Sequence, residues 1–394
     1  MMEIADRPRI RAAGTRAEPA PLAFVRRLDW VLLAAAAALV GYGLWVIAGV
    51  TRFDVAGDEN YYVVRQAIAA GLGFVGLVVA AVVPVDVWRR HWQLLYVGTL
   101  AVMFVVFAAA ESIRGSRRWI DVGVIQFQPS ELGKVLFVLA IAGFLVERAG
   151  RVGRRRTILS ALGLGAAPIL LVFLQPDLGT AMVYSAALFA VLFFVGVRWR
   201  QLLALLVAAV IGVVSILWLL PAAGIQVLKP YQAARLTLDP EADPSGITYN
   251  LNQSITAVGS GGLTGRGPDA ASQTRLDYLP EHATDFAFAS LAEQRGFVGS
   301  AILLLLYLLV VWRGLRVITV AGDLYGAVVA GGLVFAFLFQ VFVNVGMTMG
   351  VAPVTGIPLP FVTVGGSSMV ANLVLVGVLE GIHVRGQLSE RPPP

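Results

Sequence analysis

The chain lacks cysteine and is poor in charged residues and histidine. Only 14% of its 394 residues are Asp, Glu, Lys or Arg, against about 25% in a typical soluble domain. The absence of cysteine excludes disulfides, thiolate nucleophiles and Cys-ligated metals. The three histidines, His91, His282 and His383, are far apart and show no His-x-x-x-His spacing, which argues against a His-built zinc site.

Long uncharged runs take the place of the missing charge, and 58% of the residues are hydrophobic. A membrane-spanning helix needs roughly 20 mostly apolar residues, so this pattern indicates a membrane protein and not a large soluble core. The uncharged runs that we assign to spans are residues 30–50, 66–85, 91–110, 157–176, 178–197 and 201–228.

Four further spans bring the expected total to ten. Residues 131–147 and 285–312 are apolar, with a few charges near their starts, and residues 324–379 carry no charge at all. The last run is long enough for two spans, with prolines marking the break. We therefore predict an all-α polytopic membrane protein with ten transmembrane helices and one large extracytoplasmic loop between helices 7 and 8.

The basic residues predict the orientation. With the N-terminus inside, 19 of the 30 Lys and Arg residues fall in inner segments, as the positive-inside rule requires, and both termini are then cytoplasmic. We expect a disordered basic arm (1–28), a ten-helix membrane domain (29–384) with its outer loop at about 229–284, and a cytoplasmic tail (385–394). The basic residues are dispersed between spans, which argues against nucleic-acid binding.

Two similar motifs open spans on the outer side. Residues 127–134 read FQPSELGK and residues 174–181 read LQPDLGTA, and both carry helix-start signals. For Asp177 in the second motif, simple capping and a substrate role are equally favoured. Glu131 and Lys134 differ, because they share one helix face at membrane depth, where ionisable groups are costly and usually functional.

Two more spans begin on the same side, at Thr284-Asp285-Phe286 and at Gly365-Gly366-Ser367-Ser368. Helix N-termini are ready anion sites, so four converging starts would suit a phosphate or pyrophosphate. The plainer alternative is that alternate spans of any such protein begin outside. Arg117 and Arg118 lie in an outer loop, where lipid headgroups and a phosphate-bearing substrate explain them equally well.

Together these motifs resemble the SEDS (shape, elongation, division and sporulation) family, which includes RodA, FtsW and SpoVE. The similarity runs from the first span to the tenth, and Trp119-Ile120-Asp121 is more like the elongation branch, RodA, than the division branch, FtsW. The matching motifs are residues 117–121 (RRWID), 126–131 (QFQPSE), 175–180 (QPDLGT), 259–263 (GSGGL), 279–286 (LPEHATDF) and 358–368 (PLPFVTVGGSS).

The resemblance implies a peptidoglycan glycosyltransferase of the bacterial cytoplasmic membrane. Such an enzyme polymerises lipid II into glycan strands on the outer face during cell elongation, with a class B penicillin-binding protein as transpeptidase partner. The family's functional aspartate falls on Asp285, and its glutamate and lysine of the fourth span fall on Glu131 and Lys134.

Two positions depart from the family pattern. The family usually has His directly before Thr-Asp, but here Ala283 stands there and His282 lies one residue earlier, which leaves the role of this histidine open. Val364 replaces an aromatic residue before the Gly-Gly-Ser-Ser run. Neither departure touches Asp285.

Lipid-linked pyrophosphate is a good leaving group, so one carboxylate base and positive groups form a sufficient catalytic set. We assign the base to Asp285, with Glu131 orienting Lys134. The resemblance also suggests a divalent cation, Mg²⁺ or Mn²⁺, although the sequence has no clear cluster of oxygen ligands for one. The expected supporting or substrate-binding residues are Glu131, Lys134, Arg117, Arg118, Asp177, Thr284, Ser367 and Ser368.

Three other functions compete with this one. An FtsW-type division glycosyltransferase would share the same motifs. A lipid II flippase should carry polar groups through the midplane, whereas the charges here cluster at the outer ends and residues 324–379 have none. A pure scaffold for a penicillin-binding protein would not need Glu131, Lys134 and Asp285.

We expect the partner to dock near the eighth and ninth spans and the large outer loop. Gly331 and Gly332, with the aromatic Phe335, Phe337 and Phe339, would allow close helix contact there. Packing inside the bundle explains the same residues at least as well.

Overall fold

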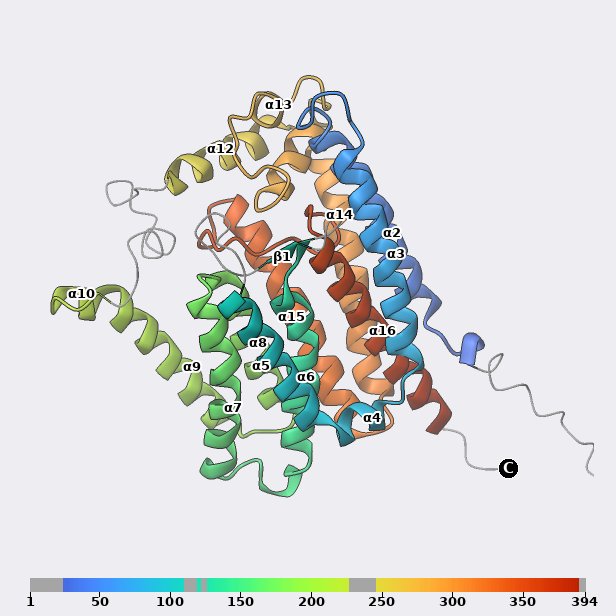
Figure 1. The fold of residues 1–394 in the computed structure, drawn as a ribbon, viewed down its shortest axis with the longest axis vertical. Helices are drawn as coiled ribbons and strands as arrows, with labels where there is room; N and C mark the ends of the chain where they lie inside the picture. The colour runs from blue at the N-terminus through green and yellow to red at the C-terminus, as the bar shows by residue number, and fades with distance from the viewer. Residues whose placement is uncertain (1–23, 110–118, 122–125, 227–245, 390–394) are drawn as a thin grey trace, which may run out of the picture.

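The computed structural model describes residues 24–109, 119–121, 126–226 and 246–389, and it is mostly helical (Figure 1). Arg117 and Arg118 lie outside the described residues. The long helices are α2 (Trp30–Val50), α3 (Tyr61–Val82), α5 (Trp92–Ala109), α6 (Pro129–Val146), α7 (Arg155–Leu174), α8 (Leu178–Phe194), α9 (Trp199–Val214), α14 (Ala287–Val320), α15 (Leu324–Thr348) and α16 (Gly366–Ser389).

Short elements complete the described fold. A π-helical turn (Ser215–Leu219) carries α9 on into α10 (Leu220–Ala222). The other short elements are α4 (Val85–Arg90), a 3₁₀ turn (Ala149–Arg151), α12 (Ile247–Ser260), α13 (Ser272–Arg275), and the antiparallel strands β1 (Ile120–Asp121) and β2 (Gln126–Phe127).

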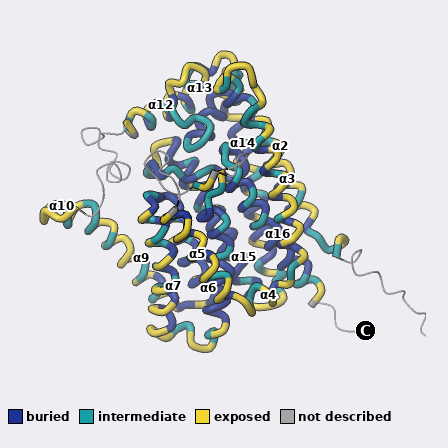
Figure 2. Tube along the Cα trace, in the orientation of Figure 1, coloured by how far each residue is buried: buried dark blue, intermediate teal, exposed yellow. Residues whose placement is uncertain are grey.

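The chain is a multi-pass membrane protein. Among the described residues, eight helices are long and apolar enough to cross a membrane, and α5 and α8 are shorter apolar helices. Burial differs sharply between them: 89% of the apolar window of α6 is buried, against 6% in the span formed by α9 and α10 (Figure 2).

The bundle has two ends, which we call the loop end and the α4 end. Helices α12 and α13 cover the loop end, at the top of Figure 1, and α4 lies at the opposite end. The backbone N–H of Asp29, before α2, donates to Glu380 near the end of α16, so both described ends of the chain lie at the α4 end. Helices α6 and α15 run through the centre, and α9 with α10 projects away from the bundle (Figure 1).

Aspartates cap several helices. Asp29, Asp177 and Asp323 each accept a hydrogen bond from the backbone N–H three residues later, at the starts of α2, α8 and α15. Such caps satisfy N–H groups that have no partner within the helix. Capping therefore accounts for one contact of Asp177 without any ligand.

The eighth span does not run unbroken from Asp285, contrary to the sequence-based prediction. Helix α14 starts at Ala287 and breaks at Gly296, whose φ of 66° and ψ of −162° are not helical. The backbone of residues 262–267 enters this break and pairs with both sides of it through Arg266 N to Glu293 O, Gly267 N to Gln294 O, Phe297 N to Gly262 O and Val298 N to Leu263 O. Only glycine fits at 296, because a Cβ there would lie 2.4 Å from Gly265 N. The apolar part of the span thus begins after the break.

Glu293 lies above this break and does not face lipid. It is fully buried, and its carboxylate accepts hydrogen bonds from the backbone N–H groups of Gln273 and Thr274 and from the Thr274 hydroxyl. The segment that contains α13 is therefore attached to the first part of α14 by hydrogen bonds to a buried carboxylate.

The orientation argument counted Arg313 among the basic residues of the inner segments between spans, but the structure places it within a helix. It lies within α14, is 8% exposed and pairs with Asp29, which also caps α2. Glu380 on α16 is fully buried beside this pair. A charged contact thus holds α2, α14 and α16 together at the α4 end.

Gly331 and Gly332 pack inside the bundle, so the proposed close helix contact with a partner at these glycines is wrong. A Cβ at Gly331 would lie 2.3 Å from the Phe194 ring of α8, and one at Gly332 would meet Val138 and Val191. The small residues allow α15 to approach α6 and α8.

Candidate functional site

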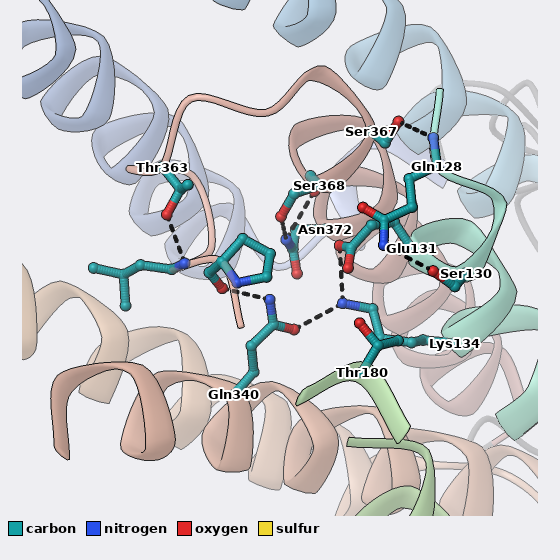
Figure 3. A network of polar contacts seen from close by, with 12 residues as sticks. Gln128, Ser130, Glu131, Lys134, Thr180, Gln340, Thr363, Ser367, Ser368 and Asn372 are labelled. Atoms are coloured by element: carbon teal, nitrogen blue, oxygen red, sulfur yellow. Dashed lines mark hydrogen bonds and ion pairs between the residues drawn. The ribbon is translucent and has the colours of Figure 1, made fainter. Parts of the chain in front are cut away.

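The starts of α6, α8 and α16 are joined by hydrogen bonds at the loop end, and Figure 3 shows the one between Gln128 and Ser367. The backbone N–H of Gln128 donates to the Ser367 hydroxyl (2.7 Å), which donates to the Gln126 carbonyl (2.8 Å). The Gln128 amide group also donates to Asp177 Oδ2 (2.8 Å). Ser367 and Asp177 therefore link the helix starts to one another.

The turn before α14 joins the same group. The backbone N–H of Val364, in the loop before α16, donates to the Ala283 carbonyl at 3.0 Å. Gln66 on α3 fixes that loop, because its side chain donates to Thr363 O and accepts from Gly365 N. All four helix starts that the sequence singled out are thus connected at one end of the bundle.

Lys134 and Glu131 lie buried just beneath these starts. Lys134 Nζ is 3.0 Å from Glu131 Oε2 and 2.8 Å from Gln340 Oε1, with exposures of 8% for the lysine and 1% for the glutamate. Figure 3 shows the pair between Gln340 on one side and Ser368 and Asn372 on the other. A small cavity is lined by Glu131, Lys134, Gln340 and Asn372, among others.

The two carboxylate oxygens of Glu131 differ in their contacts. Its Oε1 is buried and has no hydrogen-bond partner among the described residues. A buried carboxylate oxygen without a partner is costly, so the site retains an acceptor that the fold itself does not use.

Two amides on α15 bind the site together, and the sequence reading missed both. Gln340 accepts from Lys134 and donates to Pro358 O (2.7 Å). One turn later, Asn344 donates to the Asp285 carbonyl (3.1 Å) and to Ile357 O (2.7 Å). Their signal was present as two amides four residues apart in an uncharged run, a spacing that places them on one helix face.

Asp285 is half-buried and lies in a tight turn two residues before α14. Glu281 has a φ of +55°, and its carbonyl accepts from the N–H groups of Thr284 and Phe286. Non-glycine residues rarely adopt this conformation, and such strain is concentrated at functional sites.

Thr284 and Ser368, like Ser367 and Asp177, make contacts within the fold. The Thr284 hydroxyl donates to the Glu281 carboxylate at 2.7 Å, and Ser368 accepts from Asn372. These side chains therefore stabilise the backbone around the candidate site. Asp285 and Lys134 are the acidic and basic groups of that site.

A protein-built metal cage does not fit the described residues. They contain no group of three or more His, Asp or Glu side chains placed to hold a metal ion. Divalent cations such as Mg²⁺ bind through several oxygen ligands, and the described His, Asp and Glu side chains supply no such set.

Comparison with known proteins gives a consistent result. A family model described as the cell cycle protein family FtsW/RodA/SpoVE matches residues 28–387. The peptidoglycan glycosyltransferase MrdB of Escherichia coli (strain K12) is 37% identical over 366 residues, covering 92% of this chain and 95% of the relative. Stage V sporulation protein E of Bacillus subtilis (strain 168) is also 37% identical, covering 83% and 87%.

Solved structures agree with these relatives. A chain of a peptidoglycan synthase complex that coordinates polymerization and crosslinking superposes with a TM-score of 0.76 at 31% identity, covering 91% of this chain and 98% of that one. The rod shape determining protein RodA of Thermus thermophilus gives a TM-score of 0.64 at 28% identity, covering 90% and 96%.

Proposed function

This chain belongs to the FtsW/RodA/SpoVE family, and from that premise we propose that it polymerises lipid II into glycan strands with Asp285 as the general base. The chain is a peptidoglycan glycosyltransferase, as its 37% identity to MrdB over nearly the whole length of both proteins indicates. The assignment of the site depends chiefly on one observation: a half-buried aspartate in a strained turn and a buried Lys–Glu pair contact successive turns of α15, through Asn344 and Gln340.

The reaction requires one proton acceptor. Asp285 takes the proton of the acceptor sugar hydroxyl, whose oxygen forms the new bond to the anomeric carbon of the donor. The bond from that carbon to the lipid pyrophosphate breaks, and the pyrophosphate leaves with the electron pair. A single displacement of this kind inverts the anomeric centre.

Positive groups stabilise the charge that develops on the pyrophosphate. Among the described residues, we propose Lys134 for this task, with Glu131 and Gln340 fixing its ammonium group. Arg117 and Arg118 are proposed for the same task. The family resemblance suggests a Mg²⁺ or Mn²⁺ ion for the same task, but the described residues offer no group of three His, Asp or Glu side chains that would hold it.

The proposed setting is the bacterial cytoplasmic membrane, with ten spans, cytoplasmic termini and the loop end outside. The eight long apolar helices plus α5 and α8 supply ten candidates. The elongation role is supported by the likeness to RodA structures and by a higher identity to MrdB, 37%, than to the FtsW of Tolumonas auensis, 34%.

The partner is proposed to be a class B penicillin-binding protein, which docks its membrane helix between α14 and α15. A groove of about 350 Å³ lies there, lined by Leu304, Tyr307, Leu308, Val311, Leu338, Val341, Phe342, Val345, Gly346, Met349 and Val351. Leu308 and Phe342 are each 62% exposed, so the groove offers an apolar surface against which a membrane helix can pack by van der Waals contact. The solved relative in a synthase complex supports such a partner.

Val345→Trp would fill this groove and should abolish co-purification with the transpeptidase. Leu206→Trp, on the exposed face of α9, is the matched control and should leave co-purification intact. Equal recovery of the partner with both variants would place its docking surface elsewhere.

The decisive test of the activity is polymerisation of purified lipid II by the purified protein, with and without a cognate transpeptidase. Glycan strands resolved by gel electrophoresis are the expected product. Failure of the wild-type protein to form them in the presence of its partner would reject the proposed activity.

A further inference from the structure

His282 contacts an aspartate that is distant in sequence. Its Nε2 lies 3.0 Å from Asp54 Oδ1, in the loop between α2 and α3 and 228 residues away in the chain. The side chains are 11% and 20% exposed, so the contact is largely shielded from water. It joins the α2–α3 loop to the turn that carries Asp285.

Three further contacts that hold this turn are formed by uncharged groups. The Ser290 hydroxyl donates to the His282 carbonyl, Val364 N donates to the Ala283 carbonyl, and the Asn344 amide donates to the Asp285 carbonyl. The hydroxyl, amide and carbonyl groups that form these three contacts keep the same protonation state from about pH 5 to about pH 9. The histidine contact, by contrast, titrates near neutral pH.

Two carboxylates face the imidazole. Asp54 comes from the α2–α3 loop, and Asp277, after α13, lies 3.6 Å from Nδ1, too far for a hydrogen bond. Burial lowers the pKa of His282, but the hydrogen bond to Asp54 and the charges of Asp54 and Asp277, together with a backbone contact at Leu279, more than offset this, so the pKa lies above its ordinary 6.5.

We propose that His282 and Asp54 form a pH-dependent brace that positions the turn of Asp285 for catalysis. His282 is thereby a positioning residue, although it stands one position earlier in the sequence than the family's usual histidine. The proposal rests on the proposed function, because it assigns the brace to the turn of the catalytic base.

The sign of the pH effect follows from the raised pKa. The folded protein favours protonated His282, so the stabilisation is complete below the ordinary pKa and is lost as the pH rises through the raised value. Above it, a charge-assisted hydrogen bond becomes a neutral, weaker one. The turn then loosens, and polymerisation should fall on the alkaline side.

The test compares His282→Gln and Asp54→Asn with wild-type protein in lipid nanodiscs, from about pH 6 to about pH 9. Both changes keep a hydrogen-bonding group and remove the ion pair. We expect kcat/KM for lipid II to drop about three- to tenfold at the lower pH and the alkaline decline to disappear in His282→Gln and to shift to lower pH in Asp54→Asn. Glu59→Gln, on the same loop and paired with Arg52, is the matched control and should behave as wild type.

Thermal unfolding over the same pH range separates this proposal from the proposed function. Wild-type stability should fall with rising pH, and less so in the two variants, whether or not the protein polymerises lipid II. A polymerising wild type whose pH profiles of activity and unfolding are unchanged by Asp54→Asn and by His282→Gln would overturn the brace and leave the glycosyltransferase assignment intact.

Discussion

At the scale of single residues, Asp285 and Lys134 are held in different ways. Asn344 and the strained Glu281 turn fix the backbone of Asp285, whereas Glu131 and Gln340 hold Lys134 by its ammonium group. A base must approach the acceptor hydroxyl and a cation must stay near the leaving group, so the two tasks suit a half-buried carboxylate and a buried lysine.

Asp285→Asn should reduce polymerisation about a hundredfold or more, because an amide cannot accept the proton and general base catalysis is worth at least that factor. Asparagine keeps the shape and polarity of the side chain, and the contact to Asn344 is made by the backbone, so folding and partner binding should persist. Lipid II turnover and co-purification measure the two effects. Near-normal turnover would reduce Asp285 to a residue of the turn.

Lys134→Met should destabilise the fold by about 3–5 kcal/mol, because it leaves Glu131 buried without its counter-charge. Adding Glu131→Gln should recover much of this loss, since the buried charge is then gone. Unfolding of both single variants and the double variant, analysed as a double-mutant cycle, measures the coupling. A double variant no more stable than Lys134→Met would show that the ion pair does not couple the two residues.

The sequence pointed to the charged members of the proposed site and missed the neutral ones. Glu131, Lys134 and Asp285 stood out because a charge at the edge of an apolar run is costly. Gln340 and Asn344 did not, because an amide within a span is compatible with packing inside the bundle as well as with function. The His282–Asp54 contact joins residues 228 positions apart, and no local pattern predicts such a pair.

At the scale of elements, the break in α14 explains the glycines of the sequence motif 259–263 (GSGGL) and of the residues that follow it. The apolar pattern predicted the spans that contain α2, α6 and α15, but it could not show the break, because a helix interrupted by one glycine has nearly the same hydropathy as a continuous one. The backbone of residues 262–267 replaces the helical hydrogen bonds lost at Gly296, and the segment before the break carries Glu293 and begins two residues after Asp285.

Gly296→Ala should destabilise the protein by about 2–4 kcal/mol, since alanine disfavours a positive φ and its Cβ meets the backbone of Gly265 and Leu263. Gly212→Ala in α9 is the control: nothing lies within 4 Å of its Cβ, and alanine should gain about 0.5–1 kcal/mol in a helix. Thermal unfolding of both variants checks this. Equal stability would mean that the break relaxes freely.

At the scale of the whole molecule, the polar groups are divided between the two ends of the bundle. The loop end gathers the site, and the α4 end holds the Asp29–Arg313 pair beside Glu380. Chemistry at one end and a structural charge cluster at the other suit an enzyme that works on one face of a membrane.

The orientation can be tested by labelling, and the cysteine-free sequence makes this clean. Cysteine at Leu263, which is 68% exposed near the loop end, should react with an impermeant thiol reagent added to intact cells. Cysteine at Gly153, between α6 and α7, should react only after the membrane is opened. Labelling of position 153 in intact cells would invert the proposed topology.

The unequal burial of the spans also sets an order of events during biosynthesis. The span of α9 and α10, with only 6% of its window buried, finds its final surroundings in lipid as soon as it leaves the translocon. Helix α6 does not: Lys134 is inserted beside Glu131, but Gln340 emerges from the ribosome 206 residues later. Arg313, the partner of Asp29, is synthesised 284 residues after it. The nascent chain is thus committed to the bilayer long before its polar interior can assemble, and the early helices must be tolerated there with their final partners still unsynthesised.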